Sequence, residues 1–195
     1  MLLELIPSDA SSPLSVSERD LAALAACERG TILLDVSARA DATLMALTGT
    51  NGRIALELRG GRLYGEQVLG ADGSPAAGPQ AGDGVERRVL DAEDALGLDD
   101  GRPHTIALSV NETGTHLYAD GYECFSTTLT AFLSQIGLTG VSIDPDGIAE
   151  VTRLAAWAEP LSDRAVMAQS LAATPMVQFA ASELSARDAR RTGAL

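Results

Sequence analysis

The chain has 195 residues, a net charge of −13 and a pI of about 4.4, and 46% of its residues are hydrophobic. This length and composition allow one large domain, or one domain with a tail, built around a real core. Nucleic acids and anionic membrane surfaces attract positively charged proteins, so the acidic charge argues against both as partners. All 14 basic residues are arginine, which is typical of GC-rich coding and gives any single arginine less weight.

The first 20 residues lack the basic start and the long apolar run of a signal peptide. No stretch of the chain approaches the roughly 18 apolar residues that a membrane span needs. We therefore expect a soluble protein whose signal, if it is exported, has been removed.

The first predicted element is a helix within residues 15–30. Ser15 or Ser17 can cap it, Glu18 lies in its first turn, and Gly30 is expected to end it.

Short, nearly alternating apolar runs follow and predict four strands, at residues 31–38, 43–49, 53–60 and 62–70. Asn51-Gly52 and Gly60-Gly61 predict tight hairpin turns between them, because these residues tolerate positive φ. Residues 70–84 have no periodicity and are expected to form a long loop before a strand at 85–91.

Three further strands predict a meander, at residues 104–111, 115–120 and 122–127. Alternation places Ile106, Leu108 and Val110 on one face of the first strand, and Leu117 faces inward from the second.

The remaining elements are a short helix, a strand, a turn, a longer strand and a final helix, at residues 129–136, 140–144, 144–147, 149–159 and 161–172. Val151 and Leu154 are expected to pack around Trp157 in the longer strand. Ser162 is expected to cap the final helix, with Asp163 in its first turn.

About ten short strands with little helix between them indicate an antiparallel β-sandwich. We predict one such domain at residues 15–171, with an N-terminal extension at 1–14 and a C-terminal tail or linker at 172–195.

Cys27 and Cys124 lie far apart, without a C-x-x-C motif or a histidine cluster, so a zinc site is not expected. Two buried thiols are the favoured interpretation. A disulfide, which would indicate an oxidising compartment, stays open.

Several segments together resemble a known family. The stretch "DGRPHTIALSVNETGTHLYADGYE" resembles the signature of laminin-G-like and concanavalin A-like jelly rolls, with Pro103 where such domains usually have Trp. "ACERGTILLDVSARADATLMALTGTN", "TTLTAFLSQIGLTGVSI" and "AEVTRLAAWAEPLSDRAV" are similar to the lectin-like domain that precedes the catalytic domain in bacterial sialidases. The resemblance covers roughly residues 15–170 and implies an all-β, concanavalin A-like jelly-roll β-sandwich with a few short helices.

The resemblance also implies a function. Several members of this group are carbohydrate-binding modules for sialic acid, in which a Glu-x-Arg pair on a strand contacts the sugar. The matching pair is Glu57 and Arg59. Tyr64 and Arg88, on neighbouring strands, could replace an Arg and a Tyr that the family takes from a late loop, which is reduced here to "DPDG". A solvent-facing ion pair between Glu57 and Arg59 is the open alternative.

The motifs of sialidase catalysis and the paired carboxylates of jelly-roll glucanases are missing from the sequence, so we do not expect an enzyme. His104 is interpreted as a structural, half-buried imidazole. Asp144 and Asp146 are weak candidates for a Ca²⁺ site, although a turn-forming role is favoured. No other metal or cofactor is expected.

The expected function is thus a non-catalytic, lectin-like carbohydrate-binding module of a bacterial, sialidase-associated type, with a glycan partner such as sialic acid. Such a protein would be secreted or displayed at the cell surface, and a cytoplasmic location stays open. The alternative is a structural or interaction domain that has lost the sugar site and self-associates through its C-terminal tail, where Arg187, Arg190 and Arg191 cluster.

Overall fold

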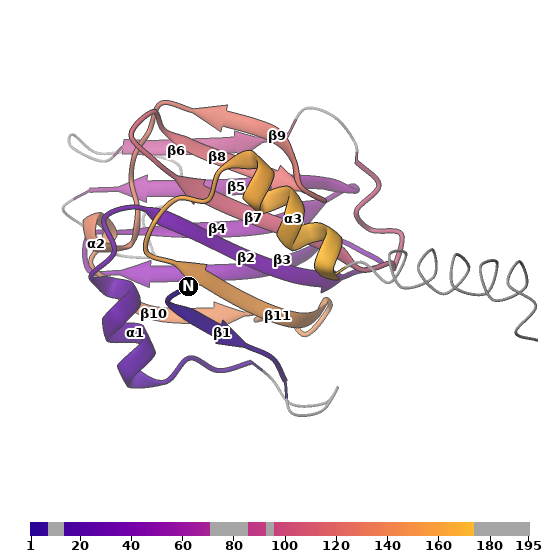
Figure 1. Ribbon diagram of the computed structural model, residues 1–195, viewed down its shortest axis with the longest axis horizontal. Coiled ribbons are helices and arrows are strands. Elements are labelled where there is room, and N and C mark those ends of the chain that lie inside the picture. The colour runs from indigo at the N-terminus through magenta and orange to yellow at the C-terminus, as the bar shows by residue number, and fades with distance from the viewer. Residues whose placement is uncertain (8–13, 71–85, 93–95, 174–195) are drawn as a thin grey trace, which may run out of the picture.

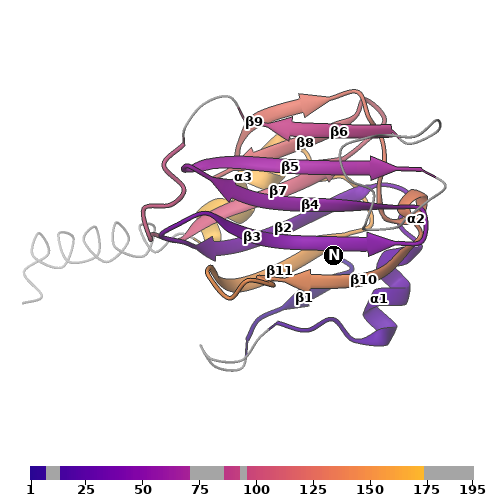
Figure 2. The same ribbon diagram turned by 180° about the vertical axis from the view of Figure 1, so that it is seen from behind.

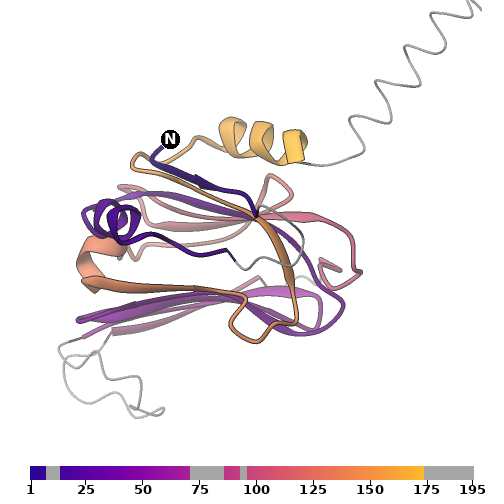
Figure 3. The same cartoon turned by 90° about the horizontal axis from the view of Figure 1, so that it is seen from below.

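The computed structural model describes residues 1–7, 14–70, 86–92 and 96–173, which form two stacked sheets (Figures 1 and 3). The six strands of one sheet are, in spatial order, β1 (Leu3–Leu5), β11 (Glu150–Trp157), β2 (Gly30–Ser37), β7 (His104–Val110), β8 (Thr115–Ala119) and β9 (Tyr122–Thr127). The five strands of the other are β10 (Leu138–Ile143), β3 (Ala42–Gly49), β4 (Gly52–Arg59), β5 (Arg62–Leu69) and β6 (Glu86–Asp91). All neighbouring strands in these sheets run antiparallel, which confirms the predicted jelly-roll β-sandwich.

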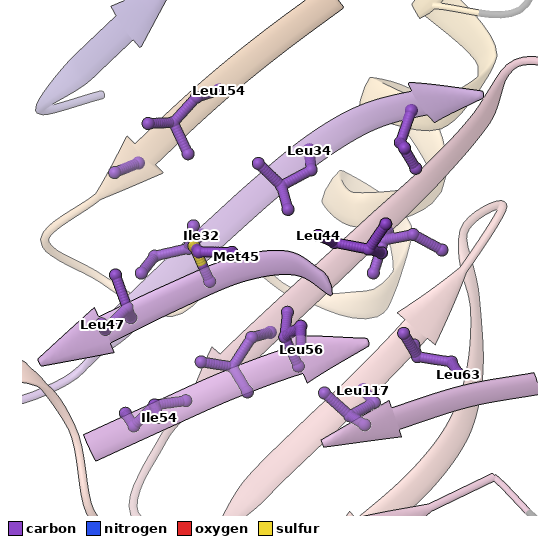
Figure 4. Close-up of a cluster of buried hydrophobic side chains, with 14 of the residues drawn as sticks. Ile32, Leu34, Leu44, Met45, Leu47, Ile54, Leu56, Leu63, Leu117 and Leu154 are labelled. Carbon is purple, nitrogen blue, oxygen red and sulfur yellow. The ribbon is translucent and has the colours of Figure 1, made fainter. Parts of the chain in front are cut away.

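The core fills the space between the two sheets (Figure 4). Ile54, Leu56 and Leu63 of the five-stranded sheet pack in one cluster with Leu34 and Leu117 of the other sheet. Each of these side chains is at most 1% exposed. Burying one such side chain contributes about 1.5–3 kcal/mol, so alternation in the strands fixes which face turns inward.

The Gly60-Gly61 turn joins β4 to β5 as predicted. Both glycines have positive φ, 57° and 72°, which is the geometry of a two-residue hairpin turn. The turn pairs Arg59 with Arg62 and thereby sets the register of the whole hairpin.

Helix α1 spans Glu18–Ala25, and the Oγ of Ser17 accepts the N–H of Asp20 at its start. This confirms one of the two predicted caps. The predicted end at Gly30 is wrong, because Gly30 is the first residue of β2. A Cβ on Gly30 would lie 2.1 Å from the carbonyl oxygen of Trp157, so close backbone approach explains this glycine.

Helix α2 (Leu133–Ile136) is shorter than predicted, and α3 (Asp163–Ala173) begins after Ser162, whose Oγ accepts the N–H of Ala165. Figure 3 shows α3 against the outer face of the six-stranded sheet. The prediction that Leu154 packs around Trp157 is wrong, because residues three apart on a strand face opposite sides. Leu154 points into the core, whereas Trp157 packs on the outer face beside Leu33, Tyr118 and Val166, at α3.

Both cysteines are free thiols, with Cys27 buried and Cys124 half-buried. Burial raises the pKa of both thiols, that of Cys124 to about 11. The favoured interpretation of two buried thiols therefore holds for Cys27, whereas Cys124 is an unpaired thiol that is only half-buried.

Residues 3–5, within the predicted N-terminal extension, form the edge strand β1 and pair with β11. The predicted long loop after Gly70 and the tail from Thr174 lie outside the described residues. In the part of the chain that the structure describes, no helix has the length and apolar character to cross a membrane.

Candidate functional site

The candidate site lies on the outer face of the five-stranded sheet, which faces the viewer in Figure 2 with α3 behind it. Along β4, Ile54, Leu56 and Leu58 are buried against the other sheet. The intervening residues must therefore point outward, and they include Glu57 and Arg59.

The hairpin register brings Tyr64 to the same face. Because Arg59 pairs with Arg62 across the turn, Glu57 pairs with Tyr64. The structure thus brings three of the predicted site residues together: Glu57, Arg59 and Tyr64.

These three side chains form one connected unit. Nε of Arg59 donates to Oε2 of Glu57 at 2.7 Å, and Nη2 lies 2.6 Å from the same oxygen. The guanidinium carbon of Arg59 lies 3.7 Å from the centre of the Tyr64 ring. The side chain of Arg59 is nonetheless 53% exposed, so a partly solvated cation is held in a fixed orientation on the sheet.

The fourth predicted residue, Arg88, has a different place in the register. Its backbone pairs with that of Gln67, a fully buried residue on the inward face of β5. The register does not bring Arg88 to the unit formed by Glu57, Arg59 and Tyr64.

A second Arg–Glu pair on the same face was not predicted. Arg53 of β4 forms an ion pair with Glu66 of β5, and the side chain of Glu66 is 8% exposed. The register could have revealed it, because Arg53 shares its face with Glu57, and Glu66 shares its face with Tyr64. Ala55, which has a small side chain, lies between the two pairs on this face of β4.

Two aspartates border the site. Oδ1 of Asp41 accepts the N–H of Gly60 at 2.6 Å, next to Arg59. Oδ2 of Asp146 lies 3.4 Å from the backbone nitrogen of Thr43, the residue that pairs with Glu57.

Asp144, the other weak Ca²⁺ candidate, takes part in the turn before β11. Its Oδ1 accepts the N–H groups of Ile148 and Ala149, each at 3.0 Å, and its φ is 43°. Among the described residues, no group of three or more His, Cys, Asp and Glu side chains has the geometry to hold a metal ion.

His104 is a partly buried, fully engaged side chain, as interpreted from the sequence. Its ring nitrogens contact Asp120 and Asp100, and its side chain is 13% exposed.

No protein-family model matches the chain, and no curated protein matches it in sequence. Solved structures do match its fold. The sialidase module described as Ruminococcus gnavus IT-sialidase CBM40 aligns with a TM-score of 0.61 and 17% identity, over 87% of this chain and 99% of that one. The same module has been solved with α2,3- and α2,6-sialyllactose, each with a TM-score of 0.59.

Two further matches belong to larger proteins. The leech intramolecular trans-sialidase, in complex with 2,7-anhydro-Neu5Ac, aligns with a TM-score of 0.59 and 17% identity over 85% of this chain and 28% of that one. The binding domain of botulinum neurotoxin DC in complex with SialylT aligns with a TM-score of 0.51 and 11% identity over 77% of this chain and 37% of that one. The chain therefore has the concanavalin A-like jelly-roll fold of the sialidase-associated, lectin-like modules, as the resemblance implied.

Proposed function

We propose that this domain is a non-catalytic carbohydrate-binding module of the sialidase-associated type, which holds sialylated or related glycans on the outer face of its five-stranded sheet. The observation that supports this most is the unit of Glu57, Arg59 and Tyr64, an oriented and half-exposed guanidinium between a carboxylate and an aromatic ring. Structures of the same fold are described as complexes with sialyllactose.

Each member of the unit has a chemical role in this proposal. The guanidinium of Arg59 donates to a glycan carboxylate or to hydroxyl groups, in the forked geometry that suits carboxylates. Glu57 fixes the guanidinium through one carboxylate oxygen and accepts hydrogen bonds from hydroxyl or amide groups of the sugar. Tyr64 supports the guanidinium from beneath and offers its ring edge to the apolar face of a sugar.

The site is open and has few contributing groups, so binding is expected to be weak. We expect a Kd between micromolar and millimolar, about 4–8 kcal/mol of binding free energy.

Calorimetric titration with 3′-sialyllactose, with lactose as the neutral comparison, tests the proposal. Binding of sialyllactose should be lost in Arg59→Ala and Glu57→Ala. Arg29→Ala is the matched control, because Arg29 also forms an exposed ion pair, with Glu112 in the turn between β7 and β8, away from the five-stranded sheet. This variant should bind as the unmodified protein does. Absence of heat with every glycan, or equal binding by Arg59→Ala and Arg29→Ala, would contradict the proposal.

One observation favours the alternative of an interaction domain that has lost its sugar site. The turn beside the site contributes Asp146, and Asp41 adds a second negative charge near Arg59, so the site has more carboxylates than cations. If no glycan binds, light scattering on the full chain decides between a monomer and a stable assembly.

A further inference from the structure

His104, at the start of β7, has a carboxylate at each of its two ring nitrogens. Nδ1 lies 2.8 Å from Oδ2 of Asp120, and Nε2 lies 3.1 Å from Oδ1 of Asp100. A neutral imidazole has one N–H and one lone pair, so one of these contacts would oppose a lone pair to a carboxylate oxygen. Only the imidazolium donates to both oxygens.

The surrounding charges favour the same protonated form. The hydrogen bond that His104 donates to Asp120 is the main cause that raises the pKa of His104. Burial opposes it, and the bond and charge of Asp100 add to it. Oδ1 of Asp120 also accepts the N–H of Thr105 at 2.9 Å, which fixes this carboxylate. We call the group of His104, Asp100 and Asp120 the clamp. Other charged groups near the clamp are Asp35, Arg39, Arg102 and Arg153.

The Asp100 end of the clamp lies in the segment 96–103, which reaches the candidate site. The N–H groups of Leu96 and Leu98 both donate to the carbonyl oxygen of Gly61, each at 3.2 Å. Oδ1 of Asp99 lies 2.7 Å from where a Cβ on Gly61 would be. Gly61 belongs to the turn that directly follows Arg59.

A continuous set of contacts therefore joins His104 in one sheet to Arg59 in the other. We propose that His104 is a positioning residue for the glycan site, because its imidazolium holds Asp100, and with it the segment 96–103, against the Gly60-Gly61 turn that orients Arg59. This inference rests on the proposed function, but the link between His104 and the turn can be tested without any glycan.

Loss of the proton releases this arrangement. A neutral His104 can donate to only one of its two carboxylate partners. Without the ring contact, Asp100 keeps, among the described residues, only its contacts with Arg102, a residue of its own segment. The segment 96–103 then loses one of its attachments and keeps the hydrogen bond from Gly101 to Ala38 and the buried Leu98 side chain, so the Asp100 end becomes looser and the orientation of Arg59 is less well defined. Glycan affinity should fall as pH rises above the ordinary histidine pKa of about 6.5 and through the raised pKa of His104.

The first test is titration of 3′-sialyllactose at about pH 5.5 and about pH 9, on either side of the ordinary histidine range. We expect the Kd of the unmodified protein to rise about fivefold or more between them, which is the lower end of ordinary coupling between sites. His104→Gln and Asp100→Asn should bind weakly at both pH values. His116→Gln is the matched control, because His116 of β8 is a partly buried histidine paired with Glu123 of β9, and this variant should keep the pH dependence. Parallel pH profiles for the unmodified protein and His104→Gln would overturn the inference.

The second test is an NMR pH titration of the ligand-free protein. The amide resonances of Gly60 and Gly61 and the Nε–H resonance of Arg59 should shift with the same midpoint as the His104 ring, and should not shift in His104→Gln. If these resonances do not follow His104, the inference is wrong, whatever the glycan result. If they follow it and no glycan binds, the link is real and the proposed function fails.

Discussion

The guanidinium of Arg59 lies 3.7 Å over the ring of Tyr64, and the same guanidinium is held at its edge by Glu57. Arg59 and Tyr64 come from opposite sides of a two-glycine turn, so a tight hairpin creates the contact.

Tyr64→Ala should weaken glycan binding, because it removes the ring that supports the guanidinium of Arg59. An exposed cation–π contact contributes about 0.5–1 kcal/mol, so the Kd should rise roughly twofold to fivefold. Tyr64→Phe keeps the ring and should bind nearly as the unmodified protein does. Calorimetry measures both, and equal losses in the two variants would show that the hydroxyl group, not the ring, matters.

Arg53→Gln should weaken the binding of long glycans while leaving short ones unaffected. Arg53 and Glu57 are four residues apart on one strand, about 13 Å, so a ligand must extend beyond a single sugar to reach both. A series from a sialic acid monosaccharide to longer sialylated glycans tests this. An equal effect of Arg53→Gln on every length would refute an extended binding face.

Replacing a buried leucine beneath α3 should destabilise the fold strongly. Leu33 is 0% exposed and packs with Val166 on the outer face of the six-stranded sheet, so Leu33→Ala should lower the free energy of unfolding by about 2–5 kcal/mol. Leu171→Ala is the matched control, because Leu171 of α3 is 53% exposed and should change little. Urea denaturation measures both. A loss below about 1 kcal/mol in Leu33→Ala would mean that α3 does not cover this face.

The clamp at His104 should also give stability a defined pH dependence. His104 donates a hydrogen bond to Asp120, which raises the pKa of His104. The stabilisation from His104 is therefore complete below its unfolded-state pKa of about 6.5 and is lost as the pH rises through its folded-state pKa. The pKa of Asp120 is lowered, because its hydrogen bonds from His104 and Thr105 outweigh the effect of burial. The stabilisation from Asp120 is therefore present above its unfolded-state pKa of about 3.9 and is lost as the pH falls through its folded-state pKa.

Denaturant unfolding of the unmodified protein and of His104→Gln at several pH values measures this contribution. The difference in unfolding free energy between the two should be largest at about pH 4–6.5 and should shrink toward alkaline pH. A difference that stays constant to about pH 9 would mean that His104 is not charged in the folded protein.

Much of the sandwich could be predicted from the sequence, because alternation and turn chemistry are local. Gly60-Gly61 alone fixes the partner of every residue in its hairpin, so the contact between Glu57 and Tyr64 follows from counting away from the turn. The same counting would have found Arg53 and Glu66, and the next pair of strands places the backbone of Arg88 opposite Gln67 rather than Tyr64.

Errors arose where distant segments meet. A glycine at position 30 is typical of a helix end, but here the glycine is needed because its backbone lies close to the carbonyl oxygen of Trp157. The sequence predicts that Val151 and Leu154 pack around Trp157, but Trp157 lies three residues from Leu154 on the strand and so packs under α3. The contact of Leu96 and Leu98 with Gly61 joins residues about 35 positions apart through backbone groups, which no side-chain pattern reveals.

The most direct test of the central claim is chemical-shift mapping of the ¹⁵N-labelled protein with 3′-sialyllactose and, separately, with lactose. We predict that sialyllactose shifts the amides of Glu57, Arg59 and Tyr64 and the Nε–H of Arg59, and that Arg59→Ala abolishes these shifts. Shifts confined to the six-stranded sheet, or no shifts at millimolar sialyllactose, would contradict a glycan site on the outer face of the five-stranded sheet.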